Sequence, residues 1–495
     1  MPENVTAECW TGAVTMNSDE PTPWSTPLSF LLERTPEIAV RSVVRSGVDP
    51  LVESIEFDSR QVAAGSLFCC LRGGHRDGHE FAGAAVQSGA VALLTDHELD
   101  LPVAQVVVDD TRPAMAHLAA AYFDRPSRDL MVIGVTGTNG KTTITHILEC
   151  ALAALGHRVG SIGTLSGVHT TPEAPELQRR LATFRREGFD AVAMEVSSHA
   201  LALDRVLGTR FRVGIFTNLG RDHLDLHETQ ERYFAAKARL FDPALTEHGV
   251  VNVDDVHGRL ILDASNIPCT PFSGADALDQ AVGPFEHEYT WRGVRIRVGL
   301  GGRFNVLNTL AAATTLAVVG YSPPEIAKAL AATTPVRGRF EPVDAGQPFA
   351  VIVDYAHTPD ALVAVLEAAR GIAAQHQVRL VFGCGGDRDH EKRPQMGSIA
   401  VEHADQVVVT SDNPRSEDPM AIIDDVIDGV PSDYRGRITV EPDRHQAIAL
   451  ALAAAAPGDV VIIAGKGHET TQTFRSTVAP FDDRAVAQEL LETMK

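Results

Sequence analysis

The sequence predicts an α/β protein of three domains, and both its length and its apolar pattern support that prediction. The chain has 495 residues, more than one hydrophobic core fills, since a domain commonly holds about 150 residues. Short apolar runs alternate with helical stretches, which is the pattern of parallel strands covered by helices. We expect a flexible tail at 1–26 and domains at 27–127, 128–338 and 339–495.

The first domain is predicted to be a small α/β unit. Its apolar pattern predicts strands at 54–60, 66–71, 91–95 and 103–108, with a helix at 81–87 between them. The opening stretch is polar, mixed in charge and contains proline, so it is predicted to be a loose tail.

The central domain is predicted to hold a largely parallel sheet, and the C-terminal domain a second open sheet. The apolar runs of the central domain end at Thr136, Glu195, Thr217 and Asp254. Buried strands of the C-terminal domain are predicted at 350–354, 378–383, 407–411 and 460–464. Ligands of open sheets bind beyond the carboxyl ends of the strands, so chemistry is expected in the loops that follow them.

The composition excludes several classes of function. Hydrophobic residues make up 44% of the chain and charged residues 22%, typical of a globular protein, and no apolar run reaches the ~20 residues of a membrane span. The start of the chain lacks the basic end and apolar centre of an export signal. A net charge of −22 argues against non-specific nucleic-acid binding.

The cysteine pattern indicates a reducing compartment. Six cysteines are spread along the chain without C-x-x-C spacing, which favours reduced thiols and no cysteine zinc site. We therefore expect a cytoplasmic protein.

The most informative segment is an apolar run at 132–136 followed by a glycine-rich turn and a Lys-Thr-Thr helix start. Backbone N–H groups of such a turn point at a polyphosphate, and the helix adds its positive N-terminal dipole. Lys141 can reach the terminal phosphates and the Thr142 hydroxyl can bind Mg²⁺, so the predicted ligand is ATP. The strict G-x-x-x-x-G-K-[ST] pattern would place glycine where the chain has Val135. The alternative is a glycine-rich turn that only ends a strand.

Two further side chains are candidate magnesium ligands. Glu195 ends a buried run, where a nucleotide-binding sheet places its metal ligands; the alternative is a strand-end glutamate in solvent. His223 shares a loop with Arg221, Asp222 and Asp225, and could bind a second Mg²⁺ or orient a carboxylate. A purely structural histidine is the alternative there.

Other polar residues and loops each give only weak evidence for a functional site when taken alone. Lys237 lies on an amphipathic helical stretch, where the residue pattern alone indicates a surface lysine. Polar loops follow four predicted strands of the C-terminal domain, at 354–360, 383–389, 412–415 and 465–469. Because such loops converge on one crevice, together they predict a binding site.

Five of these segments together resemble the Mur ligases of peptidoglycan synthesis. They are 137–143, 195–199, 218–225, 354–360 and 412–415. The resemblance runs from about residue 27 to the end of the chain in the family's order. It implies a nucleotide-sugar-binding N-terminal domain, a central P-loop-type ATPase domain and a Rossmann-like C-terminal domain that brings the amino acid.

The resemblance also implies an activity: ATP-dependent addition of meso-diaminopimelate to UDP-N-acetylmuramoyl-L-alanyl-D-glutamate through an acyl phosphate. The implied cofactors are ATP and two Mg²⁺ ions, the partners are these small molecules rather than nucleic acid or membrane, and we expect a monomer. The alternatives are the same ligation with L-lysine, a ligase similar to folylpolyglutamate synthetase, and a non-catalytic nucleotide-binding regulator. About 130 residues with Asp58-Ser59-Arg60 precede the phosphate loop, which folylpolyglutamate synthetase lacks.

Site residues transfer from the family by position. The implied ATP contacts are Gly137, Thr138, Asn139, Gly140, Lys141, Thr142, Thr143, Asn305, Arg339 and Asp354. The implied contacts to the UDP-muramoyl peptide are Ser59, Thr170, Thr171, Ser197 and Arg205. The implied metal ligands are Thr142, Glu195, His223 and Lys237, and the implied catalytic residues are Lys141, Lys237 and His223. Lys237 is carbamylated by CO₂ in the family, which would make it an anionic ligand and overturn the surface-lysine interpretation.

The amino-acid site is expected in the C-terminal loops. Its predicted residues are Arg388, Asp412, Asn413, Pro414, Arg415, Gly465 and Glu469. Diaminopimelate differs from lysine by a second carboxylate beside its distal ammonium, and the guanidinium fork of Arg415, helped by Arg388, suits that carboxylate. Glu469 can accept from the ammonium. The alternative is that Arg415 forms an internal salt bridge.

Overall fold

A computed structural model describes residues 24–44, 47–74, 76–167, 169–220, 222 and 224–494, without the side chains of residues 224 and 225. The chain forms two compact units. The first comprises Met1–Asp129, Ile162–Glu187 and Ala202–Thr209, and the second comprises Leu130–Ser161, Gly188–Leu201 and Arg210–Lys495. The predicted tail lies outside the described residues as far as residue 23.

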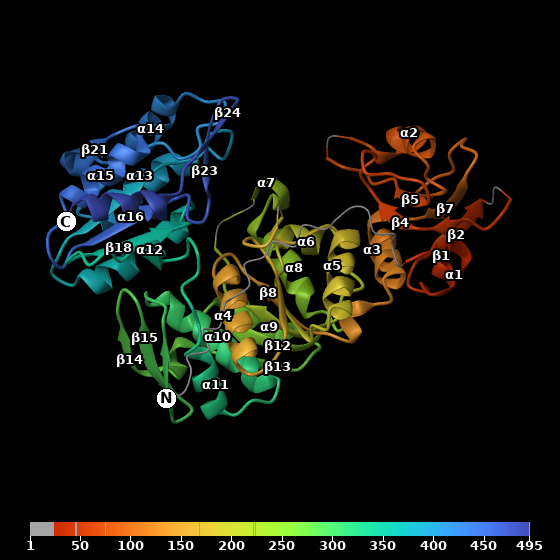
Figure 1. The fold of residues 1–495 in the computed structure, drawn as a ribbon, viewed down its shortest axis with the longest axis horizontal. Coiled ribbons are helices and arrows are strands. Elements are labelled where there is room, and N and C mark those ends of the chain that lie inside the picture. Colours follow the sequence, from red (N-terminus) through yellow and green to blue (C-terminus); the bar gives the residue numbers. More distant parts are fainter. Residues whose placement is uncertain are drawn as a thin grey trace. The chain divides into compact units, whose positions relative to one another are not determined.

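The first unit contains a five-stranded sheet in the order β2-β7-β6-β5-β4 (Figure 1). Its strands are β2 (Val40–Val44), β4 (Ser54–Glu56), β5 (Ser66–Cys69), β6 (Ala92–Thr95) and β7 (Ala104–Val108). Strands β4 to β7, which the sequence predicted, pair in parallel, whereas the edge strand β2 is antiparallel to β7 and was not predicted. The first strand is shorter than predicted because Asp58 accepts from the Arg60 N–H (3.0 Å) and so forms a turn.

Helices pack on this sheet and bury a continuous apolar core. The helices of the unit are α1 (Leu28–Glu33), η1 (Gly78–Phe81), α2 (Ala82–Gln87), α3 (Thr111–Tyr122), η2 (Pro126–Arg128) and α5 (Ala174–Arg186). Leu118 of α3 and Ala182 of α5 share the core with Leu94 and Val106 of the sheet. A short pair, β1 (Thr26–Pro27) with β3 (Leu51–Val52), completes the unit.

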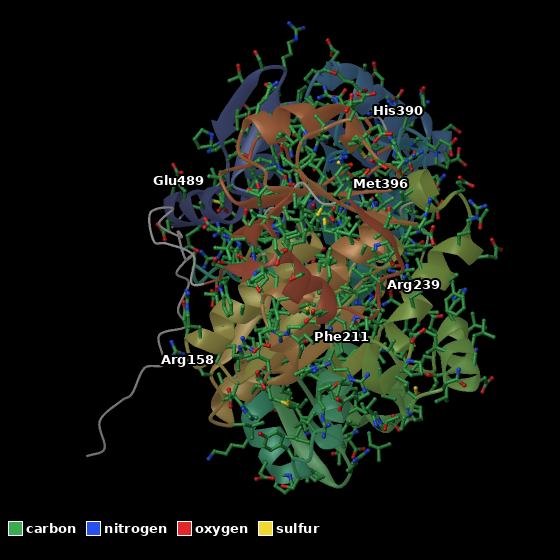
Figure 2. The ribbon with its side chains drawn as sticks, turned by 90° about the vertical axis from the view of Figure 1, so that its right-hand side faces the viewer. Arg158, Phe211, Arg239, His390, Met396 and Glu489 are labelled. Atoms are coloured by element: carbon green, nitrogen blue, oxygen red, sulfur yellow. The ribbon has the colours of Figure 1, made fainter. Side chains whose placement is uncertain are left out.

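The second unit begins with a six-stranded sheet in the order β13-β12-β11-β8-β10-β9. Its strands are β8 (Met131–Thr136), β9 (Val159–Ile162), β10 (Ala191–Glu195), β11 (Phe211–Phe216), β12 (Thr246–Asn252) and β13 (Cys269–Phe272). Strand β8 pairs in parallel with β10 and β11, β11 with β12, and β12 with β13, which confirms the predicted central sheet. The buried Phe211 of β11 is labelled in Figure 2. Gly134 of β8 lies against its ring, because a Cβ added to Gly134 would come within 2.8 Å of the ring.

Helices and one unpredicted small sheet cover the central sheet. The helices are α4 (Lys141–Ala154), α6 (Ser198–Ala202), α7 (Leu224–His227), α8 (Gln230–Ala238), η3 (Arg239–Phe241), α9 (Val256–Ala264), η4 (Gly274–Asp276), α10 (Phe304–Val318) and α11 (Pro323–Leu330). An antiparallel sheet is formed by β14 (Leu278–Val282), β15 (His287–Trp291) and β16 (Val294–Val298). Tyr289 and Ile296 of this sheet enter the same core as Leu310 of α10, so the insertion is part of the central core.

The C-terminal part of the second unit is a second open sheet, in the order β17-β18-β22-β19-β20-β21. Its strands are β17 (Glu341–Pro342), β18 (Ala350–Asp354), β19 (Val378–Phe382), β20 (Gln406–Val409), β21 (Ile438–Val440) and β22 (Val460–Ala464). Alternate residues enter different cores: Ile462 packs with Leu366, and its neighbours Val461 and Ile463 pack with Leu452. Both faces are therefore covered by helices, which confirms the predicted Rossmann-like architecture.

Local sequence signals define the helices of this part. They are α12 (Pro359–Ala373), α13 (Lys392–His403), α14 (Pro419–Asp428), η5 (Ser432–Arg437), α15 (Arg444–Ala453) and α16 (Asp483–Thr493). The Thr358 hydroxyl caps α12 with Pro359 in its first turn, and Asp482 caps α16. A hairpin of β23 (Thr471–Phe474) and β24 (Thr477–Pro480) precedes the last helix. Across the described ranges, no helix has the length and apolar character needed to cross a membrane.

A fully buried ion pair joins the last two helices to the loops of the C-terminal sheet. Arg444 Nε and Nη2 each donate to the Asp483 carboxylate at 2.7 Å, and both side chains are 0% exposed. The same guanidinium donates to Ala464 O (2.9 Å) and to Ser411 O (3.3 Å), the last residue of β22 and a residue just after β20.

We predict that Arg444→Met lowers the free energy of unfolding by about 3–5 kcal/mol, because Asp483 would remain as an unpaired buried charge. Urea titration followed by circular dichroism measures this. The control is Arg297→Met, which removes an exposed guanidinium paired with Glu286 and is expected to cost about 1 kcal/mol or less. Equal losses in the two variants would contradict the structural role of the buried pair.

Candidate active site

The glycine-rich turn joins β8 to α4 and leaves the first turn of that helix open to an anion. Gly137 and Gly140 adopt φ values of +148° and +88°, in the region that favours glycine. A Cβ on Gly137 would lie 1.8 Å from the Thr217 hydroxyl. No described side chain caps α4, so the N–H groups that begin the helix at Lys141 stay available to phosphate oxygens.

The loop after β11 holds this turn in place, a role that the residue pattern alone did not assign. Asn218 accepts through O from Thr138 N–H and through Oδ1 from Asn139 N–H, each at 2.9 Å. The Thr217 hydroxyl donates to Asn139 O (2.6 Å), and Gly220 N–H donates to the Thr138 hydroxyl (2.9 Å). Asn218 directly follows a strand of the sheet, so the strand-end rule was the signal that could have identified it.

Two lysine amines meet on one backbone carbonyl of the turn. Lys141 Nζ donates to Gly137 O (2.8 Å) and Thr138 O (2.9 Å), and Lys237 Nζ donates to the same Gly137 O (2.9 Å). Lys237 is 1% exposed, so the surface-lysine interpretation is wrong. Its amine lies over the Tyr233 ring (4.3 Å to the centroid), whose hydroxyl lies 3.1 Å from the Thr138 hydroxyl.

The electrostatics of the two amines follow from burial and from their proximity. Burial, and then the positive charge of Lys141, lower the pKa of Lys237 well below its usual range. Burial also lowers the pKa of Lys141, although the Glu195 carboxylate opposes this. An anion bound at this turn would favour the protonated form of Lys141.

Oxygen donors suited to Mg²⁺ lie beside the turn. The Thr142 hydroxyl donates to Glu195 Oε2 (3.1 Å), and both side chains are buried. Carboxylate and hydroxyl oxygens are ligands that Mg²⁺ prefers, so this pair fits the ion. The predicted metal ligand His223 and its loop neighbour Arg221 lie outside the described residues.

Two more predicted ATP residues, Arg339 and Asn305, lie close to the same turn. Arg339 Nη2 lies 3.4 Å from the Thr142 hydroxyl, its guanidinium stacks on the Tyr355 ring, and its buried Nε has no hydrogen-bond partner among described groups. Asn305 donates to Gly301 O (2.7 Å) and accepts from Asn308, which borders Gly140.

Asp354 holds the start of the C-terminal part in place. Its carboxylate accepts from Phe340 N–H and Ala356 N–H at 2.7 Å each. Burial raises the pKa of this carboxyl, while the Arg339 charge and the two backbone donors act against that rise. The carboxylate therefore fixes the backbone next to Arg339 in the described structure.

The residues predicted to bind the UDP-muramoyl peptide divide between the two units. In the first unit, Arg205 donates to Thr171 O (3.1 Å) and forms an ion pair with Glu173 (2.9 Å). Thr170 lies in the same loop, its hydroxyl 3.1 Å from that of Thr164, and Ser59 lies in the turn after β4. Ser197 belongs to the second unit, where its hydroxyl accepts from Ala200 N–H (3.1 Å).

Three loops of the C-terminal sheet converge after β19, β20 and β22, which are neighbours in the sheet. A Cβ on Gly386 would lie 1.9 Å from Pro414 O, and a Cβ on Gly465 would lie 2.6 Å from the Asp412 carboxylate. Asn413 Nδ2 donates to Glu469 Oε2 (2.8 Å). The structure therefore brings together the residues predicted to bind the amino acid in the loops after β20 and β22.

A fully buried lysine, which sequence reasoning did not assign to a role, ties these loops together. Lys466 Nζ donates to Thr471 O (2.6 Å), Glu469 Oε2 (3.2 Å) and Asn413 Oδ1 (3.5 Å), and Lys466 is 0% exposed. It therefore positions the Glu469 carboxylate and the Asn413 amide. The sequence feature that could have identified Lys466 is its position in the Gly-Lys-Gly-His-Glu loop after β22.

Arg415 faces the neighbouring glycine-rich loop. Its Nη1 donates to Gly386 O (2.6 Å), and its backbone has φ +53°. Within the described ranges no carboxylate comes within ion-pair distance of its guanidinium. Arg388 is exposed in the same glycine-rich loop.

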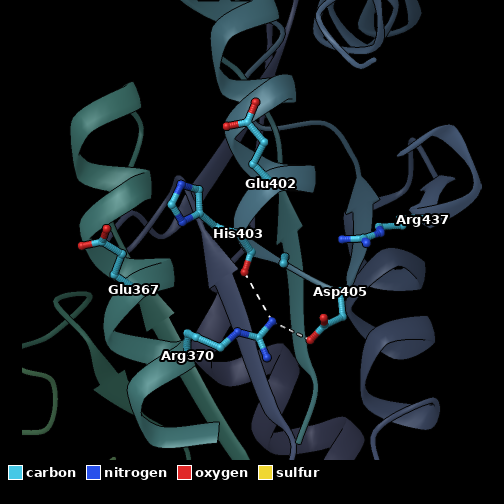
Figure 3. A pocket seen from close by; sticks show the side chains of 7 residues that line it. Glu367, Arg370, Glu402, His403, Asp405 and Arg437 are labelled. Atoms are coloured by element: carbon cyan, nitrogen blue, oxygen red, sulfur yellow. Dashed lines mark hydrogen bonds and ion pairs between the residues drawn. The ribbon is translucent and has the colours of Figure 1, made fainter. Parts of the chain in front are cut away.

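A hollow of about 240 Å³ lies at the opposite edge of this sheet, where strand β20 begins (Figure 3). Arg370 crosses it and donates to Asp405 Oδ2 (2.6 Å) and His403 O (3.5 Å). Because Arg370 already donates to the last residue of α13 and to the residue just before β20, we interpret the hollow as structural.

The phosphate turn, its paired amines and the second, Rossmann-like sheet define a nucleotide-binding α/β protein. Comparison with known proteins narrows this class. Sequence profiles match in chain order: "Mur ligase family, catalytic domain" at 51–131, "Mur ligase middle domain" at 135–316 and "Mur ligase, glutamate ligase domain" at 338–467. The chain belongs to the Mur ligase family.

Individual relatives agree with this family. The UDP-N-acetylmuramoyl-L-alanyl-D-glutamate-2,6-diaminopimelate ligase of Syntrophomonas wolfei is 44% identical over 467 residues, covering 90% of this chain and 95% of that protein. A solved structure of a ligase with the same name is 31% identical, with a TM-score of 0.67 over 95% of this chain and 99% of that one. The MurF ligase from Thermotoga maritima in complex with ADP has a TM-score of 0.59 at 20% identity, covering 89% and 96%, and shows the shared fold.

The lowered pKa of Lys237 predicts a pH-dependent stability. In CO₂-free buffer the folded amine loses its proton at a lower pH than the unfolded amine, whose pKa is about 10.4, so between the two pKa values unfolding takes up a proton. Stability from this group is present at high pH and is lost as pH falls through the folded pKa.

From pH 7 to 9, the free energy of unfolding of the wild type should therefore rise relative to Lys237→Met, by up to about 1.4 kcal/mol per pH unit. Urea titrations at several pH values measure the difference. Lys328→Met, which removes an exposed lysine, is the control and should follow the wild type. A wild type whose stability runs parallel to that of Lys237→Met would contradict the buried neutral amine.

Proposed function

We propose that this chain is an ATP-dependent ligase that joins meso-diaminopimelate to UDP-N-acetylmuramoyl-L-alanyl-D-glutamate. The observation that carries the proposal is 44% identity, over 90% of the chain, to a ligase named for that reaction. The phosphate turn with its two amines supports the use of ATP, and the loops around Lys466 support an amino-acid site. The reaction belongs to cytoplasmic precursor synthesis, and the chain acts as a monomer in this proposal.

The proposed reaction has two steps that balance. The substrate carboxylate attacks the γ-phosphorus of ATP, which forms an acyl phosphate and releases ADP. The amine of the amino acid then attacks the acyl carbon, loses a proton and displaces phosphate. Both steps bring anionic oxygens together, so the protein acts by orienting the reactants and stabilising charge.

Residues of the described site fit these tasks. Lys141, the start of α4 and Arg339 are proposed to bind the phosphates, because an amine, free backbone donors and a guanidinium all border Thr142. Thr142 and Glu195, with His223, are proposed to hold two Mg²⁺ ions. These ions would neutralise phosphate charge when bound.

Carbamylation of Lys237 is proposed for a physical reason in addition to family resemblance. Only a neutral amine attacks CO₂, forming an N–C bond and releasing a proton, and burial favours the neutral form of Lys237. The resulting carbamate is an anion beside Lys141, so it attracts the protonated amine of Lys141. It would also supply an oxygen ligand for Mg²⁺.

Domain boundaries and the remaining substrate contacts complete the proposal. We propose boundaries near residues 127 and 338, in keeping with the three profile matches. Ser59, Thr170, Thr171, Ser197 and Arg205 are proposed to contact the UDP-muramoyl peptide.

The function is tested by incubating the protein with ATP, UDP-N-acetylmuramoyl-L-alanyl-D-glutamate and meso-diaminopimelate, and weighing the products. We predict one ADP and one extended nucleotide per turnover. Lys141→Ala should lower kcat by about 10²–10³-fold, because one preorganised donor to the transition-state charge is lost. Circular dichroism verifies that the variant is folded. Full ligation by folded Lys141→Ala would refute the ATP site.

Lys237→Ala is predicted to lose at least about 10²-fold in kcat and to regain part of it when a short carboxylic acid is added, since the acid replaces the carbamate. Steady-state assays with and without acetate measure this. Lys328→Ala, the exposed-lysine control, should respond to neither change. Failure of every small acid to rescue Lys237→Ala would count against the carbamate.

Arg415 is proposed to select diaminopimelate over lysine. The Arg415 guanidinium lies in the loop that Lys466 helps to order. It donates to Gly386 O, a neutral carbonyl that does not balance its positive charge, so a ligand carboxylate can pair with it. If free lysine bound instead of diaminopimelate, Arg415 would have no ligand carboxylate to pair with. At sites built for a polar group, such a missing group lowers kcat/KM by up to about 10⁴-fold.

We predict that the wild type prefers diaminopimelate by up to about 10⁴-fold in kcat/KM and that Arg415→Ala loses most of this preference. Steady-state kinetics with both amino acids measure it. Arg475→Ala removes an exposed arginine near the same loop and should keep the preference. Comparable kcat/KM for lysine, or an Arg415→Ala enzyme that still prefers diaminopimelate, would remove Arg415 as the selector.

A further inference from the structure

Two histidines and two aspartates gather at one edge of the N-terminal sheet. His79 lies on η1, just after Asp77, while Asp96 and His97 follow the last residue of β6. The His79 side chain is 7% exposed and the Asp96 side chain 17%, whereas His97 is 53% exposed. The group is separate from the phosphate turn and belongs to the first unit.

The ring nitrogens of both histidines point at one carboxylate oxygen. His79 Nε2 lies 3.3 Å from Asp96 Oδ1, and His97 Nδ1 lies 2.5 Å from the same atom. The two rings stack with centroids 4.7 Å apart and an angle of 27°. The other oxygen of Asp96 is occupied, because Arg72 Nε donates to it at 2.6 Å.

Hydrogen bonds around His79 indicate which of its nitrogens carries a lone pair. Its Nδ1 contacts the Asp77 carboxylate, so Nδ1–H is the donor there. Its Nε2 receives the Asp96 backbone N–H (3.5 Å), which fits a lone pair at Nε2. A metal ion bound at that lone pair would also face Asp96 Oδ1, which lies 3.3 Å from Nε2, so the imidazole and the carboxylate can bind the same ion.

We propose that His79 Nε2, Asp96 and His97 bind a divalent transition-metal ion such as Zn²⁺. Two imidazoles and one carboxylate are a ligand set for zinc, cobalt or nickel, and three protein ligands leave a fourth position for water. Tetrahedral ligands about 2.0–2.1 Å from zinc lie about 3.3 Å apart, which matches the His79 to Asp96 separation. The shorter Asp96 to His97 contact must open when the ion binds.

Asp77 supports this site as an outer carboxylate. Metal-bound histidines commonly donate their second N–H to a carboxylate, which fixes the tautomer and raises ligand basicity, and Asp77 is placed for that role. The ion would tie η1 to the turn after β6. Both lie on the side of the sheet to which β4 sends the Ser59 turn, so the metal would stabilise the edge that the proposed nucleotide sugar uses.

The test is zinc binding by the metal-stripped full-length protein in excess Mg²⁺, followed by equilibrium dialysis and by the thermal unfolding midpoint. We expect one Zn²⁺ per wild-type chain and a rise in the midpoint. His97→Ala and His79→Ala should each weaken binding at least tenfold, and Asp77→Asn about 10–100-fold. Because His97 is half exposed, its alanine variant is expected to fold.

The matched control is His390→Ala. His390 is an exposed histidine of the C-terminal part (Figure 2), with Glu417 at 3.7 Å and Asp425 at 3.9 Å. Its loss should leave zinc binding unchanged. Absence of zinc binding by the wild type, equal binding by folded His97→Ala, or loss of the same zinc in His390→Ala would overturn the proposal.

Discussion

The phosphate site depends on one constraint: two lysine amines share the carbonyl of Gly137 in a buried place. Burial, and then the charge of Lys141, oppose a proton on Lys237, so the pKa of this amine is lowered. A nucleotide phosphate at Lys141 and a carbamate at Lys237 are the anions that the proposed ligase would supply. The turn itself requires glycine, because any Cβ at Gly137 would meet the Thr217 hydroxyl.

Residues at the ends of other strands of the second unit hold the phosphate turn and its first helical residues in place. Parallel strands send their loops to one edge, so Glu195 after β10 and Asn218 after β11 reach the same turn. The C-terminal sheet repeats the principle with Lys466, whose buried amine joins two loops, and with Arg444, whose guanidinium joins the ends of two strands to α16. In each case a buried cation satisfies backbone and side-chain acceptors at once, and its removal would leave acceptors without partners.

Strand-end positions were predictable from the sequence, whereas burial and long-range contacts were not. Apolar runs identified the parallel strands β18 and β22 to the residue, because strands buried on both faces read as continuous apolar segments. Lys237 was placed wrongly from its residue pattern, since an amphipathic helix does not reveal that its polar face meets another polar surface. The antiparallel sheet β14–β16 was missed although β15 and β16 pair locally across the two-residue turn Arg292-Gly293, whose residues both have positive φ. His79 and His97 could not be brought together without the fold.

In the proposed reaction, the buried amine of Lys237 is neutral and reacts with CO₂. The most direct measurement is ¹³C NMR of the protein equilibrated with ¹³C-labelled bicarbonate, comparing the wild type with Lys237→Met. We expect one carbamate resonance in the wild type that is absent from the variant and that sharpens when ATP and Mg²⁺ are added. Identical spectra for the two proteins would contradict it.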